Sequence, residues 1–240
     1  MPTTVTRAGQ RNCLDMNNLY MRATGRFLRL LLLLAVCVFL PAGTLDYWEG
    51  WLFSAVFAAC SVAMTLYLAV NDPQLLEQRM QIGPAAETER SQKIIIVAVL
   101  LVLAATPAVS ATDHRLGWSS APAVVVVLGD LLIVLAHTGF CLVFRANTYG
   151  VATIQVAQGQ NVISTGPYAV IRHPMYAWNL PMLFGTALAL GSWWGTLMVV
   201  PMIAALAARI LNEERYLAIN LAGYADYTDK VRYRLIPFIW

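Results

Sequence analysis

The sequence predicts an all-α fold, a polytopic integral membrane helical bundle with about six spans. Of its 240 residues, 59% are hydrophobic and only 12% are charged, and the mean hydropathy is +0.61. Soluble domains carry about twice that share of charged residues, so this chain has too few charges to cover a globule in water. A helix crosses the hydrocarbon core with about 20 mostly apolar residues, and several stretches of the chain approach or reach that length.

The first two predicted spans are residues 28–45 and 51–70. Arg29 lies at the entrance of the first stretch, and Pro41 lies near its exit. The second stretch follows the acidic turn 46–50, whose tryptophan is expected in an interfacial aromatic belt. The first apolar run is too long for a cleaved signal peptide and lacks a small-x-small exit, so we expect a retained helix.

The next two predicted spans are residues 94–112 and 122–144. Both are almost free of charged residues. The last two, residues 175–190 and 196–210, are separated only by the short turn 191–195, which predicts a C-terminal helical hairpin over 175–210. We therefore divide the chain into an N-terminal basic segment, four spans and a C-terminal region, at residues 1–26, 27–144 and 145–240.

Basic residues predict the orientation of the bundle. If residues 1–26 lie in the cytoplasm, every one of the 16 Lys and Arg residues except Arg115 falls on a cytoplasmic segment, as the positive-inside rule requires. We expect a multi-pass protein with N- and C-termini in the cytoplasm, in a bacterial inner membrane or, in a eukaryote, the endoplasmic reticulum. The net charge of +3 follows from this excess and needs no nucleic-acid partner.

Two further patterns concern the soluble parts and the cysteines. The four cysteines are far apart and form no CxxC or Cys/His cluster, so we expect neither a metal site nor a redox pair. Around Ile154, apolar and polar residues alternate between Gly150 and Gly159. This pattern predicts a short extended or hairpin segment over the membrane surface, which can cover a pocket.

Three groups of residues are predicted to converge on the cytoplasmic face. They are Gly166-Pro167-Tyr168, the run Arg172-His173-Pro174-Met175-Tyr176, and Arg209 with Glu213 and Glu214. Proline suits the first turn of a helix, so His173 is expected at the cap of the fifth span, where free N–H groups attract an anion. Arg209 and Glu213 are four residues apart and share one helix face. The returning hairpin brings that face to the membrane depth of His173.

This set of groups suits a ligand that combines a carboxylate, an ammonium group and ribose hydroxyls, as S-adenosylmethionine does. The helix N-terminus and the arginines attract the carboxylate, and the paired glutamates attract the ammonium group. A structural interpretation is also open. In it, Arg172, Arg209 and Arg215 anchor the bundle at the membrane interface, and His173 and Glu214 are their partners.

Several separated motifs resemble those of the isoprenylcysteine carboxyl methyltransferase family and its phospholipid-methyltransferase relatives. They are TGPYAVIRHPMY at 165–176, LGSWWG at 190–195, RILNEERYL at 209–217 and GYADYTDKVRYRLIPFIW at 223–240. The resemblance runs from about Asn147 to the C-terminus, whereas the first four spans resemble the family only in hydropathy. The family lacks a Rossmann domain, and this sequence likewise has no GxGxxG motif.

The resemblance implies an S-adenosylmethionine-dependent membrane methyltransferase whose catalytic region is residues 145–240. By the family pattern, a cytoplasm-facing cofactor pocket is lined by Gly166, Pro167, Tyr168, His173, Pro174 and Tyr176. Glu213 and Glu214 close this pocket from the other side. Gln155 and Asn147 also match positions in the preceding loop of the family, less specifically. The implied catalytic residues are Arg172 and Arg209, which hold a carboxylate of cofactor or substrate, and Glu214. The expected substrate is a prenylcysteine-like or other lipophilic molecule that enters from the bilayer, between membrane lipids.

Two acceptor chemistries remain open. A carboxylate is already ionised at neutral pH and can be positioned by Arg172 or Arg209, whereas a lipid amine needs deprotonation, for which Glu214 or His173 can serve. Two different functions are also open. One is an NADPH-dependent sterol-type reductase, because such reductases resemble this family around the RHPxY motif. The other is a non-enzymatic membrane protein. Family members usually have a small residue at the position of Trp178, so its ring predicts a narrowed groove or altered lipid access.

Two polar residues within the fourth predicted span are further candidates. Asp130 and His137 are seven residues apart and share a helix face, and ionisable groups within a span are often functional. They can mark a polar seam toward the pocket. The structural interpretation is a local partner for Asp130 and a hydrogen bond from His137 to a neighbouring helix.

Overall fold

The computed structural model describes residues 4–80, 87, 89–147 and 161–240, and this part of the chain contains helices and no strand. The α-helices are α1 (Thr4–Ala42), α2 (Trp48–Asn71), α3 (Pro73–Arg79), α4 (Arg90–Leu116), α5 (Ala123–Ala146), α6 (Pro174–Ala189), α7 (Val199–Asn220) and α8 (Tyr224–Lys230). Two 3-10 turns, η2 (Gly166–Ala169) and η3 (Trp194–Met198), precede α6 and α7. The predicted all-α class is confirmed. The extended segment expected around Ile154 lies outside the described residues.

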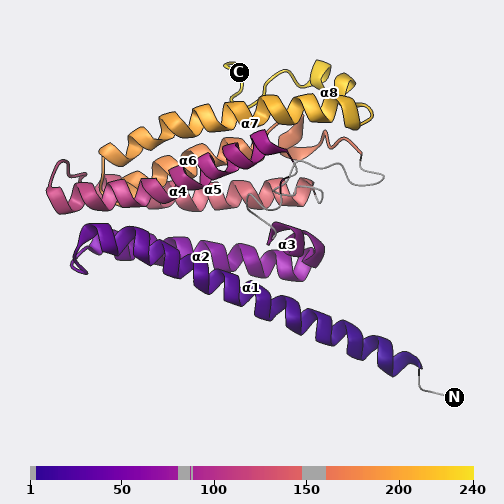
Figure 1. Cartoon of the computed structure of the whole chain (residues 1–240), viewed down its shortest axis with the longest axis horizontal. Helices are drawn as coiled ribbons and strands as arrows, with labels where there is room; N and C mark the ends of the chain where they lie inside the picture. The colour runs from indigo at the N-terminus through magenta and orange to yellow at the C-terminus, as the bar shows by residue number, and fades with distance from the viewer. Residues whose placement is uncertain (1–3, 81–86, 88, 148–160) are drawn as a thin grey trace.

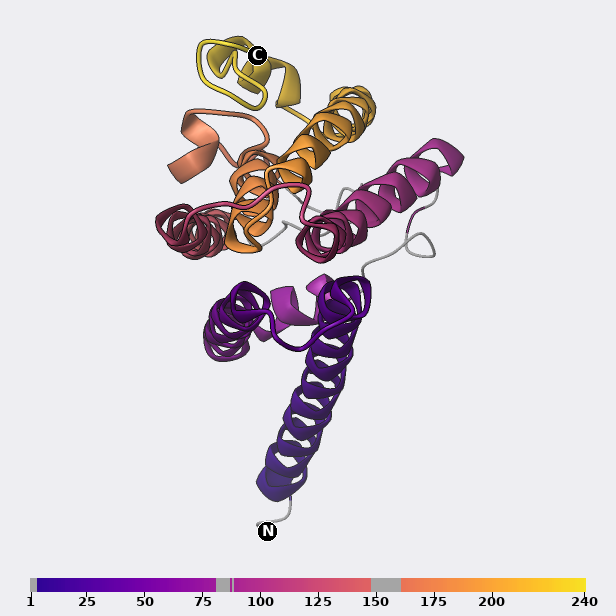
Figure 2. The ribbon, with the colours of Figure 1, turned by 90° about the vertical axis from the view of Figure 1, so that its left-hand side faces the viewer.

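The long helices form two layers (Figures 1 and 2). α1 and α2 make one layer, and α4, α5, α6 and α7 make the other. The layers meet where α1 contacts α4 and where α2 contacts α5. The short helix α3 lies at one end of the bundle, on the side of the α1–α2 layer (Figure 1).

Five helical stretches are long and apolar enough to cross a membrane. They are Asn18–Ala42, Trp48–Asn71, Arg90–Leu116, Ala123–Ala146 and Trp194–Asn220. α6 has 16 residues and rises only about 24 Å, yet it connects the same two ends of the bundle as α5. Asn147 donates a hydrogen bond to the Tyr168 hydroxyl at one end, and the Ala121 N–H donates to the Gly191 carbonyl at the other. The predicted polytopic bundle is confirmed, with α6 as a short additional pass.

α5 and α6 approach each other closely through glycines. A Cβ atom added at Gly129 of α5 would lie 2.3 Å from the backbone nitrogen of Ala189. One added at Gly185 of α6 would lie 2.9 Å from the Gly129 carbonyl oxygen. Small residues let membrane helices pack backbone to backbone, so these glycines set the spacing of the two helices.

Hydrogen bonds fix the turn between α6 and η3 at one end of the bundle. Asp113 is fully buried and accepts hydrogen bonds from the Ser119 N–H at 2.7 Å and the Ser192 hydroxyl at 2.5 Å. The Tyr47 hydroxyl donates to the Leu190 carbonyl at 2.6 Å. The turn between the two helices of the hairpin is therefore held far from η2, which lies at the opposite end.

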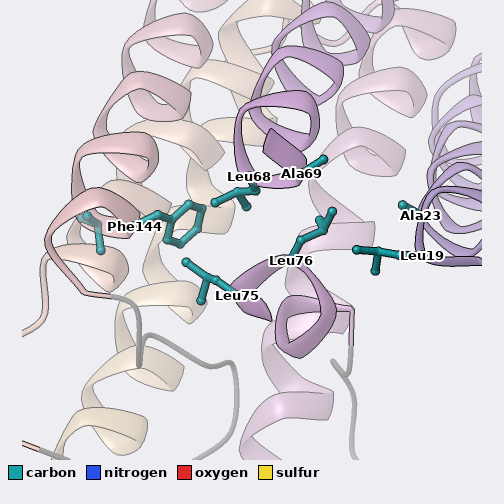
Figure 3. Close-up of a cluster of buried hydrophobic side chains, with 8 residues drawn as sticks. Leu19, Ala23, Leu68, Ala69, Leu75, Leu76 and Phe144 are labelled. Carbon is teal, nitrogen blue, oxygen red and sulfur yellow. The ribbon is translucent and has the colours of Figure 1, made fainter. Parts of the chain in front are cut away.

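α3 is held in an apolar cluster at the η2 end of the bundle. Asp72 caps the helix by accepting a hydrogen bond of 3.0 Å from the Leu75 N–H. Leu75 and Leu76 are buried against α1, α2 and Phe144 of α5, as Figure 3 shows. This packing places Arg79, the last residue of α3, at the same end of the bundle as the start of α6.

Candidate functional site

A dense group of polar side chains lies where α5 ends and α6 begins. This polar cluster comprises Glu87, Gln92, Arg172, His173, Tyr176, Arg209, Glu213, Glu214 and Arg234. Its members come from the start of α4, the turn before α6, the first turn of α6, the middle of α7 and the C-terminal segment. Residues far apart in the sequence therefore meet at one end of the bundle.

Glu214 is the centre of the ion pairs in the polar cluster. Its Oε1 lies 3.1 Å from Arg172 Nε and 3.3 Å from His173 Nε2, and its Oε2 accepts a hydrogen bond of 2.8 Å from Arg234 Nε. The Glu214 side chain is 11% exposed, so these partners replace water around its charge. Glu214 thus joins α7 to the turn before α6 and to the C-terminal segment.

Arg209 links α7 to the start of α4. Its side chain is 4% exposed, and it donates hydrogen bonds of 2.5 Å to Glu87 Oε1 and to Gln92 Oε1. Its Nε donates to the Tyr176 hydroxyl at 3.3 Å. Buried charges need partners, and here Glu87 supplies the carboxylate. Contact of Arg209 with a ligand carboxylate stays a prediction.

Glu213 has different surroundings from its neighbour Glu214. Its Oε2 accepts a hydrogen bond of 2.7 Å from the Tyr176 hydroxyl. Within the described part of the chain, no Lys, Arg or His forms an ion pair with it. The His173 ring stacks on Tyr176, with centroids 5.6 Å apart, so Glu213 is a carboxylate next to two stacked rings.

The start of α6 is built as the sequence predicts. Pro174 occupies the first turn, and His173 is the N-cap residue. The N–H groups of Arg172 and His173 donate to the carbonyls of Tyr233 and Arg234, each at 2.9 Å. These two bonds dock the C-terminal segment against the polar cluster.

The η2 turn is held from two sides. It begins at Gly166, whose φ of +58° lies in the left-handed region that favours glycine. The Tyr168 hydroxyl accepts a hydrogen bond of 3.0 Å from Asn147, and the Tyr168 carbonyl accepts one of 2.8 Å from the Tyr227 hydroxyl. Burial raises the pKa of Tyr168 and Tyr227, so both hydroxyls stay protonated at neutral pH. Gly166, Pro167 and Tyr168 therefore form a fixed turn.

The structure brings together most of the residues that the sequence predicts for the site. Arg172, His173, Tyr176, Arg209, Glu213 and Glu214 are in the polar cluster, Pro174 starts α6, and the η2 turn precedes it. Gln155 lies outside the described residues. Sequence reasoning missed the partners Glu87, Gln92 and Arg234; the one signal for them is the general need of a buried arginine for acceptors.

A small cleft lies on the α4 side of the polar cluster. Its volume is about 210 Å³, and it is lined by Glu87, Glu89, Ser91, Gln92, Asn212, Arg215 and Tyr216. Ligand pockets usually exceed about 300 Å³, so we do not place a cofactor in this cleft.

Trp178 packs over a glycine of α5. A Cβ atom added at Gly139 would lie 2.1 Å from Cε2 of the Trp178 ring. The absence of a side chain at Gly139 therefore makes room for this ring. An effect of Trp178 on lipid access stays a prediction.

The polar residues within α5 have surroundings of their own. His137 Nδ1 lies 2.9 Å from the Ile133 carbonyl, and its Nε2 lies 3.4 Å from the Ser61 hydroxyl of α2, as the structural interpretation expects. Asp130 is 5% exposed, and neither of its carboxylate oxygens has a hydrogen-bond partner among the described residues. The bonds of His137 lead to α2 rather than to the polar cluster.

Comparison with known proteins shows what this part of the chain is similar to. Residues 124–222 match a family model described as phospholipid methyltransferase, in the superfamily of isoprenylcysteine carboxyl methyltransferase-like membrane methyltransferases. No curated protein matches the chain. The matched residues include α6, α7 and the polar-cluster members from Arg172 to Glu214, and the match implies a membrane methyltransferase. The region of the chain that carries most of the polar cluster therefore matches the phospholipid methyltransferase family model.

Proposed function

We propose that this chain is a membrane methyltransferase that uses S-adenosylmethionine to methylate the carboxylate of a prenylcysteine-like or other lipophilic substrate. The observation that carries the proposal is that Glu213 has a hydrogen-bond donor but no cationic partner among the described residues. It lies in the family-matching region and in the polar cluster. Such a carboxylate is available to a ligand that brings a cation or hydroxyl donors.

The residues of the polar cluster suit the groups of S-adenosylmethionine. Glu213 can accept from an ammonium group or from ribose hydroxyls. The stacked rings of His173 and Tyr176 offer an aromatic surface next to it, which favours a sulfonium. The hydrogen bonds around η2 and the start of α6 keep these side chains in place, so little ordering is left for the binding step.

The reaction requires alignment more than proton transfer. When bound, S-adenosylmethionine supplies an electrophilic methyl group, and transfer to a carboxylate oxygen forms the O–CH3 bond, breaks the S–CH3 bond and returns its electron pair to sulfur. No protein nucleophile is needed. The chain contributes side chains that hydrogen bonds fix at the end of the bundle, and these side chains hold the reactants in line.

The ion pairs of Glu214 favour a carboxylate acceptor over an amine. An amine acceptor needs a base that removes a proton. Glu214 is bound to Arg172, His173 and Arg234, so both of its carboxylate oxygens already have partners. Glu214 is therefore poorly suited to deprotonate an amine.

The proposal is tested by a methyl-transfer assay on the purified chain in lipid nanodiscs. Isotope-labelled S-adenosylmethionine is supplied with a prenylcysteine, a phospholipid amine or a small isoprenoid acid, and products are separated by mass. We expect base-labile methyl ester on the prenylcysteine. Label on the phospholipid amine would instead support an N-methyltransferase.

A binding experiment separates cofactor from reaction. Thermal unfolding is followed with S-adenosylhomocysteine or with NADPH, and stabilisation by the first alone is expected. Stabilisation by NADPH alone would refute the methyltransferase proposal in favour of a reductase.

A further inference from the structure

Arg79 has partners that do not balance its charge. Its Nη2 donates to the Met175 sulfur at 2.7 Å, and its guanidinium carbon lies 4.3 Å from the centre of the Phe144 ring. Its Nε is buried and has no acceptor among the described residues. A thioether and a ring face are weaker partners for a guanidinium than a carboxylate.

The three arginines that belong to the polar cluster are paired. Arg172 and Arg234 share Glu214, and Arg209 pairs with Glu87. With Arg79 there are four guanidinium groups, against the three carboxylates of Glu87, Glu213 and Glu214. These described groups therefore carry one positive charge in excess, and Arg79 is the guanidinium among them that pairs with none of the three carboxylates.

Arg79 lies between a buried apolar cluster and the polar cluster. On one side, Leu75 and Phe144 belong to the apolar cluster of Figure 3. On the other side, Met175 immediately precedes Tyr176 of the polar cluster. Burial lowers the pKa of Arg79 to about 10, although the nearby Tyr168 and Tyr176 raise it. Arg79 is therefore charged at neutral pH.

We propose that Arg79 binds the carboxylate of the lipophilic methyl acceptor. The inference rests on the proposed function and deepens it, because it assigns a residue outside the family-matching region to the acceptor. A guanidinium presents a planar fork of donors that matches a carboxylate. The apolar side chains of α3 and α5 beside Arg79 suit the adjoining part of a prenyl or acyl chain. The polar amino-acid end of S-adenosylmethionine gains nothing from such apolar neighbours.

Binding of a matched pair of ligands tests the role of Arg79. The probes are an S-farnesyl thioether carboxylic acid and its primary amide, which differ only in the charged group. Their Kd values are measured by calorimetry on the full chain in nanodiscs. We expect the wild-type protein to prefer the acid by about 10- to 100-fold, the range for a charge-assisted hydrogen bond. Arg79→Gln should abolish that preference.

The control substitution is Arg22→Gln. Arg22 forms an ion pair of 2.7 Å with Glu77, and the side chains of Arg22 and Glu77 are about half exposed. Glu77 lies on helix α3, as Arg79 does. The control should keep the preference for the acid. Arg79→Lys keeps the charge without the planar fork and should keep part of the preference, so it tests the proposal if Arg79→Gln does not fold.

Three outcomes would overturn the inference. The first is a wild-type protein that binds acid and amide equally well. The second is an Arg79→Gln protein that still prefers the acid. The third is an Arg79→Gln protein whose affinity for S-adenosylhomocysteine falls as much as its affinity for the acid. The last result would assign Arg79 to the cofactor carboxylate. Failure of the wild-type protein to bind S-adenosylhomocysteine would refute the proposed function instead, while the comparison of acid and amide would still test Arg79.

Discussion

At the scale of single residues, adjacent glutamates of α7 have different chemical surroundings. Glu214 binds three cationic side chains, whereas Glu213 accepts a hydrogen bond from the Tyr176 hydroxyl. One residue along a helix turns the side chain by about 100°, so neighbouring positions face different elements. The RILNEERYL motif therefore contains one glutamate with three cationic partners and one that accepts from a tyrosine hydroxyl, which we propose to be the ligand-binding one.

The two glutamates are expected to respond differently when their charge is removed. We expect Glu213→Gln to weaken S-adenosylhomocysteine binding by roughly 10-fold or more, because it removes a charged acceptor, with little change in Tm. Glu214→Gln should lower Tm clearly, because three cations lose a partly buried carboxylate. Calorimetry and thermal unfolding of both variants check this. Equal effects of the two substitutions on both measurements would contradict the assignment.

The Arg209–Glu87 pair is expected to be coupled. Arg209→Met leaves Glu87 buried without its cation and should cost about 3 kcal/mol of stability. Glu87→Gln should also destabilise, and the double variant should lose less than the sum of the single losses. Unfolding free energies of the four proteins measure the coupling. Strict additivity would show that the pair contributes no mutual stabilisation.

At the scale of elements, glycines decide how closely α5 and α6 pack. We expect Gly139→Ala to destabilise the protein by about 1 to 3 kcal/mol, because the added Cβ overlaps the Trp178 ring. Trp178→Ala in the same chain should restore part of the loss. Gly25→Ala is the matched control in α1, since no atom lies within 4 Å of its added Cβ. Thermal unfolding compares the variants, and an equal Tm for Gly139→Ala and Gly25→Ala would contradict this packing.

The attachment of α8 predicts sensitivity to high pH. Burial raises the pKa of Tyr224 and Tyr227 above the ordinary value, which is about 10 in an unfolded chain. The unfolded state therefore loses these protons first as the pH rises, and stability falls above about pH 10. Below that pH both states hold the protons, so this contribution is constant. Tm measured from pH 7 to 11 checks the direction, with Tyr227→Phe as the variant that should show a shallower decline.

At the scale of the whole molecule, the two ends of the bundle differ in charge. Arg22, Arg79 and the arginines of the polar cluster lie at the end that carries η2. Arg115 contacts Gly43 at the opposite end. Because basic residues favour the cytoplasmic side, this separation supports the orientation that we propose, with the polar cluster at the cytoplasmic side.

Cysteine labelling in intact cells tests that orientation. On a chain without its native cysteines, Ser120→Cys should react with an impermeant maleimide applied from outside. Asp229→Cys in α8 should react only after the membrane is opened. The reverse pattern would place the polar cluster outside and refute the proposed orientation.

The spans were largely predictable because apolar length is a local property of the sequence. The end of α7 was not, since hydropathy falls after Ile210 while the helix continues to Asn220. Backbone hydrogen bonding does not require an apolar surrounding, so polar residues extend a helix beyond its apolar part. The placement of Glu213 and Glu214 on that extension shapes the polar cluster.

The sequence by itself determined that the chain is a membrane bundle and, through separated motifs, that His173, Tyr176, Glu213 and Glu214 belong to one candidate site. Composition, apolar length and motif spacing are local, so they can be read along the chain. Only the tertiary structure decided the partners of each charge. Arg209 meets Glu87 across 122 positions of sequence, and Arg79 meets a sulfur and a ring, because distances between packed helices select these contacts and no local pattern specifies them.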